Sequence, residues 1–141
     1  PEIEVELIDP QKLDLNFDED KPIPGYSEKI KKAEALFIVT PEYNHSYPAT
    51  LKRILDSEYT AYKHKPVAIS GVSSGRWGGT RAVENLLSFS RTTGLIPIKN
   101  DLNFPNINEL FDENGNLTDE SYKDYIRKAF DELIDLVKKL K

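Results

Sequence analysis

The chain has 141 residues, with 19 basic and 24 acidic side chains, a net charge of −5, and neither cysteine nor methionine. This length fits one domain over residues 1–141. Without cysteine there is no disulfide, thiolate nucleophile or cysteine-held iron-sulfur cluster, so any redox chemistry must come from a cofactor. The acidic balance and the lack of Lys/Arg clusters argue against nucleic acid and membrane surfaces as partners. Short apolar runs and the absence of a signal pattern favour a soluble, cytoplasmic protein.

The N-terminal part of the chain predicts a strand, a loop and a short helix. Residues 2–9 (EIEVELID) alternate apolar and acidic side chains, which is typical of a strand with one face toward water, often at a sheet edge. Residues 10–26 hold three prolines, a glycine and an acidic cluster, which indicates a loop. A short helix over residues 27–33, capped by Ser27, is expected to follow.

The middle of the chain predicts two strand-helix units. The apolar run from Ala35 to Val39 is typical of a parallel strand covered on both faces, and residues 48–57 have helical spacing. A further strand is expected over residues 65–71 (KPVAISG) and a helix over residues 80–91.

The C-terminal part predicts one more strand and a long helix. Residues 94–98 indicate the strand, and the segment from there to Gly115 is rich in turn signals. Thr118 is the expected N-cap of a helix that runs to the end of the chain. Strands that alternate with helices predict an open parallel α/β sheet with helices on both faces.

Two polar segments, PEYNHSYP (residues 41–48) and SSGRWGG (residues 73–79), follow predicted strands at their carboxyl ends. Such ends form one rim of a parallel sheet, where ligands bind, so both segments can face one ligand. Prolines restrict the first backbone, and glycines in the second allow close approach to a flat or anionic ligand, on which Trp77 could stack. These features suit a planar heterocycle. The alternative interpretation is that the prolines shape a turn and the glycines permit tight packing.

Other catalytic patterns fit poorly. Residues 71–75 match G-x-S-x-G between a strand and a helix, but both histidines, His45 and His64, precede Ser73, whereas a hydrolase of that type has its histidine after the nucleophile. The two histidines lack the spacing of a zinc site. A lone carboxylate such as Glu42 is more often solvated or bound to backbone amides than a general base.

Residues 40–56 (TPEYNHSYPATLKRILD) and 65–86 (KPVAISGVSSGRWGGTRAVENL) closely resemble the NADPH-dependent FMN reductase family, flavodoxin-like enzymes that include quinone, azo-dye and chromate reductases. The family's pattern P-E-Y-N-x-S-x-P-x-x-L-K is matched at Pro41, Glu42, Tyr43, Asn44, Ser46, Pro48, Leu51 and Lys52. The segment FDENGNLTDES (residues 111–121) is similar to the one before the family's last helix.

The resemblance implies a flavodoxin-like fold and an FMN-dependent NAD(P)H oxidoreductase that passes electrons to FMN, a quinone or a similar small acceptor. It implies FMN and NADPH or NADH as cofactors, and a homo-oligomer, a dimer or a tetramer. No protein acid, nucleophile or metal is required. The implied FMN-binding residues are Pro41, Glu42, Tyr43, Asn44, His45, Ser73, Ser74, Gly75, Arg76, Gly78 and Gly79.

The sequence departs from the family at its start. The segment EIEVELID matches the family's second strand, so the first strand, the phosphate-binding loop G-S-x-R-x-x-S and the first helix are missing from these residues. Arg76, Arg81 and Arg91 are candidate substitutes for the phosphate contact, although helix-start surface charge also explains them. A second hypothesis is therefore a non-enzymatic flavodoxin-like module that has lost FMN and acts as an assembly or regulatory subunit.

Overall fold

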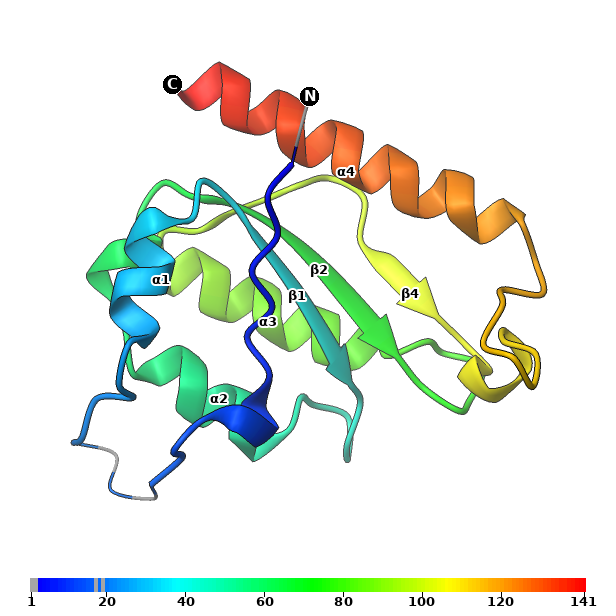
Figure 1. Ribbon diagram of the computed structural model, residues 1–141, viewed down its shortest axis with the longest axis horizontal. Coiled ribbons are helices and arrows are strands. Elements are labelled where there is room, and N and C mark those ends of the chain that lie inside the picture. The colour runs from blue at the N-terminus through cyan, green and yellow to red at the C-terminus, as the bar shows by residue number, and fades with distance from the viewer. Residues whose placement is uncertain (1–2, 17, 19) are drawn as a thin grey trace.

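A computed structural model describes residues 3–16, 18 and 20–141 of the chain (Figure 1). Its strands are β1 (Leu36–Pro41), β2 (Pro66–Val72), β3 (Ile96–Pro97) and β4 (Leu102–Phe104). Its α-helices are α1 (Tyr26–Lys32), α2 (Ala49–Asp56), α3 (Thr80–Thr93) and α4 (Ser121–Leu140). Short 3-10 turns, η1 (Pro10–Lys12), η2 (Thr60–Tyr62) and η3 (Ile107–Glu109), connect them.

All strand pairs are parallel, and β2 lies at the centre of the sheet. β1 pairs with one edge of β2, while β3 and then β4 pair with the other edge. β2 is buried along nearly its whole length, as expected for an apolar strand covered on both faces. The predicted open parallel sheet is therefore confirmed, and the arrowheads of β1, β2 and β4 point to one end of the molecule (Figure 1).

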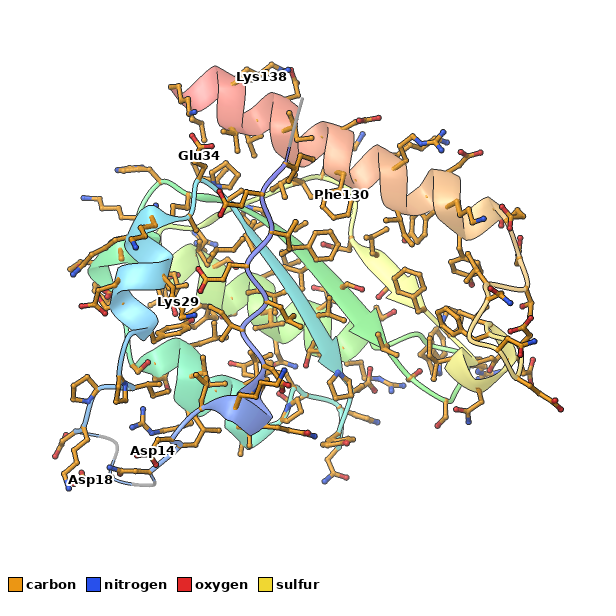
Figure 2. All side chains as sticks on the ribbon, viewed as in Figure 1. Asp14, Asp18, Lys29, Glu34, Phe130 and Lys138 are labelled. Carbon is orange, nitrogen blue, oxygen red and sulfur yellow. The ribbon has the colours of Figure 1, made fainter. Side chains whose placement is uncertain are left out.

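Helices cover both faces of the sheet, as predicted. On one face, α1, α2 and α3 build the larger core, which includes Tyr26, Ile54, Leu86 and the inward side chains of β2. On the other face, α4 packs Ala129 and Leu133 against β2 and β4. Figure 2 shows Phe130 on the sheet side of α4, where its ring stacks on Phe37 of β1 with 5.0 Å between centroids.

The strand predicted over residues 2–9 is wrong for its described part, Ile3 to Asp9; Glu2 lies outside the described residues. This segment is extended but pairs with no strand in the part of the chain that the structure describes. Glu6 pairs with Lys29 of α1 and Ile8 packs against the larger core, so the segment stays beside the sheet. An alternating pattern predicts an extended chain, but a strand also needs a neighbour whose backbone groups it can reach.

The other differences concern element boundaries. The strand predicted over residues 94–98 is only Ile96–Pro97, and the sheet edge resumes at β4, which the sequence pattern assigned to a loop. The N–H of Ile98 still donates to the Val67 carbonyl of β2 at 2.9 Å, and residues 99–101 then run without strand structure to β4. Ser27 and Thr118 were both expected to cap helices, but neither does. Ser27 Oγ hydrogen-bonds to Glu58, and Thr118 Oγ1 donates to the carbonyl of Glu109.

Candidate functional site

Two loops meet at the carboxyl ends of neighbouring strands. The first loop (residues 41–48) follows β1, and the second loop (residues 73–79) follows β2 and leads into α3. Because β1 and β2 are parallel and adjacent, both loops leave the same rim of the sheet. The sequence prediction that placed them on one rim is confirmed.

The first loop is a tight turn closed by its own backbone. The N–H of Tyr43 donates to the carbonyl of Ser46 at 2.8 Å, and the N–H of Ser46 donates back at 3.0 Å. Between them, Asn44 and His45 have φ of 50° and 68°, the left-handed pair that a type I′ turn requires. Asn is among the residues that tolerate this region best, so its presence at the first position has a conformational reason.

Side chains tie the first loop to α3. The Glu42 carboxylate accepts a hydrogen bond from the Arg81 backbone N–H at 3.1 Å and one from the Arg81 guanidinium at 2.7 Å. One helical turn later, the Asn85 amide donates to the His45 carbonyl at 3.0 Å. The turn is therefore fixed against the first turns of the helix that follows the second loop.

The Glu42 side chain is only 10% exposed, and its charge is stabilised in place. Burial raises the pKa of this carboxyl, but the hydrogen bonds and positive charge of Arg81 outweigh burial and hold the pKa below its ordinary value. A carboxylate that is ionised and doubly bonded has little tendency to take up a proton. The geometry gives Glu42 a role in holding the loops together and argues against a general base.

Backbone packing holds the second loop on the sheet. Gly79 has φ of +79°, and a Cβ there would lie 2.6 Å from Gly71 Cα. The N–H of Ser73 donates to the Phe104 carbonyl of β4 at 3.1 Å, and Ser73 Oγ donates to the Gly75 carbonyl at 2.8 Å. At Gly71 and Gly79, tight packing of the two backbones therefore explains why the residue is glycine.

Gly75 differs from these glycines. A Cβ built at Gly75 meets no atom within 4 Å, and its φ lies outside the positive region. Nor do the backbone N–H groups of residues 74–79 donate to any acceptor in the described part of the chain. The second loop thus offers consecutive amide donors and an open approach at Gly75, which fit the edge of a flat, polar ring such as the isoalloxazine of FMN.

The structure brings the sequence-predicted residues together at this rim. Pro41 ends β1, Glu42 to His45 form the turn, and Ser73 to Gly79 form the second loop. Tyr43 is 63% exposed, and Ser74, Gly75 and Arg76 are exposed too, whereas Glu42, Gly78 and Gly79 are largely buried within the loops.

Sequence reasoning missed Asn85 and the contribution of β4, and it assigned Arg81 to surface charge or phosphate. Arg81 and Asn85 are four residues apart and therefore lie on one helix face, but only the fold shows that this face meets the first loop. The segment after β4 supports the second loop as well: the N–H of Asn106 donates to Gly75 and that of Ile107 to Ser73.

Among the described residues, no helix is both long and apolar enough to cross a bilayer. Within the same residues, no group of three or more His, Asp or Glu side chains is arranged to hold a metal ion.

Comparison with known proteins places this chain in a family. Residues 1–109 match the model described as NADPH-dependent FMN reductase. An NAD(P)H-dependent FMN reductase of Pseudomonas aeruginosa is 29% identical over the whole chain and 82% of its own length. A 2-hydroxy-1,4-benzoquinone reductase of Burkholderia sp. is 29% identical over 82% of the chain and 68% of its own length.

A solved structure agrees with these relatives. FerB, a flavoenzyme NAD(P)H:(acceptor) oxidoreductase of Paracoccus denitrificans, superposes with a TM-score of 0.70 at 27% identity, over 80% of this chain. This chain spans 65% of FerB's length, slightly less than two thirds. The flavodoxin-like fold and the cofactors FMN and NAD(P)H, predicted from the resemblance, are confirmed at the level of the family. The chain belongs to the NADPH-dependent FMN reductase family.

Proposed function

We propose that this chain binds FMN at the rim between the first and second loops and catalyses the NAD(P)H-dependent reduction of a quinone or a similar small acceptor. The overall reaction is NAD(P)H + H⁺ + quinone → NAD(P)⁺ + hydroquinone, in which two electrons pass to the acceptor. FMN, when bound, supplies the redox chemistry. Family membership and the quinone-reducing relative support this proposal.

The observation that carries the proposal is the set of free amide donors on a rigid rim. The N–H groups of residues 74–79 have no acceptor among the described residues, and the turn at Asn44 and His45 is tied to α3 beside them. Fixed donors near the pyrimidine end of a flavin ring stabilise the negative charge of its reduced form without reorganisation. Under this proposal the loops would bind and orient the flavin ring and favour its reduced form, and they need not supply an acid or a base.

The predicted site residues divide into two roles under this proposal. Asn44, His45, Ser74, Gly75 and Arg76 meet the ring through backbone N–H groups or exposed side chains. The remaining residues hold those groups in place: Pro41, Glu42, Tyr43, Ser73, Gly78 and Gly79. Glu42 acts through Arg81, because its carboxylate oxygens are already bonded there.

FMN titration tests the proposal. Saturable quenching of flavin fluorescence, followed by oxidation of NADPH when a quinone is added, is the expected result. Asn44→Gly keeps the left-handed turn but removes the amide, so FMN affinity should fall with little change in stability. Ser88→Ala, an exposed change on α3, serves as the control. A wild-type chain that leaves FMN fluorescence unchanged would reject the proposal and favour the flavin-free assembly module.

We also propose that the chain works as a homo-oligomer, in the cytoplasm, where NAD(P)H is available. The outer edge of β1 pairs with no strand among the described residues. Val39 of β1 is 61% exposed, and Leu7 of the N-terminal segment is 80% exposed. An open edge and exposed apolar side chains favour association. Analytical ultracentrifugation measures the state, and a monomer at all concentrations would contradict it.

A further inference from the structure

The second loop carries a cluster of one aromatic ring and two arginines at the proposed site. Trp77 is 54% exposed. The guanidinium carbon of Arg76 lies 5.1 Å from the centroid of its ring, and that of Arg81 lies 5.6 Å from it. Both distances are within the range of cation–π attraction, so the cations lie against a flat surface that faces solvent.

The two arginines differ in how their charge is balanced. Arg81 pairs with Glu42, whose side chain is almost completely covered. Arg76 makes no ion pair and donates no side-chain hydrogen bond in the part of the chain that the structure describes. The guanidinium groups of Arg76 and Arg81 and the carboxylate of Glu42 therefore sum to one net positive charge beside the exposed Trp77 ring, although the whole chain has a net charge of −5.

The backbone adds to this positive potential. Arg76 and Trp77 lie inside residues 74–79, whose N–H groups have no acceptor among the described residues. Successive free N–H groups in a turn carry partial positive charge and favour anions. A flat ring, one uncompensated guanidinium and free amide donors are complementary to a planar aromatic molecule that carries negative charge.

From this geometry we propose that the acceptor is a planar aromatic anion, such as a deprotonated hydroxyquinone or a quinone sulfonate, and that Arg76 and Trp77 determine this specificity. The proposal rests on the proposed function, because it names the substrate class of the same site. Trp77 stacks on the acceptor ring and Arg76 pairs with its negative group. Arg81, which Glu42 holds in place, is a positioning residue: its guanidinium packs on the Trp77 ring and helps to fix the orientation of that ring.

Fluorescence provides a test that does not depend on turnover, because Trp77 is the chain's single tryptophan. In protein saturated with FMN, and again without FMN, 1,4-naphthoquinone-2-sulfonate should quench Trp77 emission saturably and more strongly than uncharged 1,4-naphthoquinone. The lack of cysteine removes thiol addition as a side reaction of either quinone. Arg76→Gln should weaken sulfonate binding about fivefold, and added salt should weaken it as well.

Matched variants separate this charge from charge in general. Arg91→Gln removes one exposed arginine from the far end of α3 and should leave the sulfonate affinity unchanged. Arg76→Lys keeps the charge and should restore part of the affinity. Equal affinities for the two quinones, or equal losses in Arg76→Gln and Arg91→Gln, would overturn the proposal.

Steady-state kinetics distinguish this proposal from its foundation. At saturating FMN, Arg76→Gln should raise KM for the sulfonate about fivefold more than it raises KM for the uncharged quinone. If Arg76→Gln instead raises KM for NADPH but not for NADH, the cluster binds the 2′-phosphate of the nucleotide and the acceptor proposal is wrong. Failure to bind FMN or reduce either quinone rejects the proposed function, while the quenching of Trp77 still decides whether the anion site exists.

Discussion

The two loops at the rim reach a fixed shape by different means. The first loop depends on charged and amide side chains that reach it from α3, chiefly Arg81 bonded to Glu42 and Asn85 bonded to the His45 carbonyl. The second loop depends on missing side chains, because Gly79 lies against Gly71 where a Cβ has no room. One loop is therefore sensitive to the loss of a charge, and the other to the gain of a methyl group.

This difference explains how one rim can be both rigid and open. A loop packed by glycines covers the end of β2 with backbone alone, and residues 74–77, whose N–H groups have no acceptor among the described residues, stay exposed. The first loop, tied by side chains from α3, brings the turn at Asn44 and His45 to the same rim. Variants of each loop can show whether the two means of fixing the rim are as separate as the contacts indicate.

Gly79→Ala should have the largest effect. The new Cβ would meet backbone atoms of Gly71 and Val72 at 2.6 Å, and φ of +79° disfavours any other residue, so the free energy of unfolding should fall by about 3 kcal/mol or more. Gly75→Ala is the matched control, since its Cβ meets nothing. Urea unfolding measures both variants.

The same pair of variants also separates folding from binding. Gly75→Ala should unfold within about 0.5 kcal/mol of the wild type, yet bind FMN more weakly because the methyl group obstructs the approach of the ring. An equal loss of stability in both variants would show that the second loop is not held by backbone packing at Gly79.

Glu42→Gln tests the tie of the first loop. Removing the charge weakens a bond to a guanidinium that is itself 40% exposed, so a loss of about 1–3 kcal/mol in unfolding free energy is expected. A double-mutant cycle with Arg81→Met isolates the pair. Additive effects of the two changes would mean that the ion pair does not hold the loop.

The pH dependence of stability should reveal the same carboxylate. Because Arg81 holds the pKa of Glu42 below its ordinary value near 4.5, ionised Glu42 stabilises the fold above that pH. The advantage of the wild type over Glu42→Gln should be full at pH 7 and shrink as the pH falls through 4.5 and below. Urea unfolding of both proteins at several pH values measures this difference. An advantage that grows in acid would contradict the assignment.

The sequence predicted the central parts of the fold well because their patterns are local. The apolar runs of β1 and β2 and the spacing of α2, α3 and α4 identify those elements within one or two residues at most ends. β4 was missed because a strand of three residues carries little sequence pattern. Its pairing with β2 is what makes it a strand. Residues 3–9 show the converse, since their clear alternation cannot form a ladder without a partner.

The shared rim of the two loops was predicted correctly, but the bonding between them was not. The prolines, Asn44 and the glycines identified both loops, because these residue types are favoured by particular backbone conformations. Which carboxylate meets which arginine depends on the distance between segments about 40 residues apart in the chain, as for Glu42 and Arg81. No local spacing encodes that contact, so the sequence did not predict the bonds between Glu42 and α3.

Asn85→Ala should have the smallest effect, because the lost bond reaches an exposed carbonyl that water can satisfy. A fall of about 0.5 kcal/mol in unfolding free energy is expected, partly offset by the better helix propensity of alanine. Ser88→Ala, one turn further along α3, controls for the propensity gain. The informative measurement is hydrogen exchange at Asn44 and His45, which should speed up in Asn85→Ala even if stability hardly changes. Unchanged exchange would mean that the Glu42 pair alone fixes the first loop, so that a single charge holds this side of the rim.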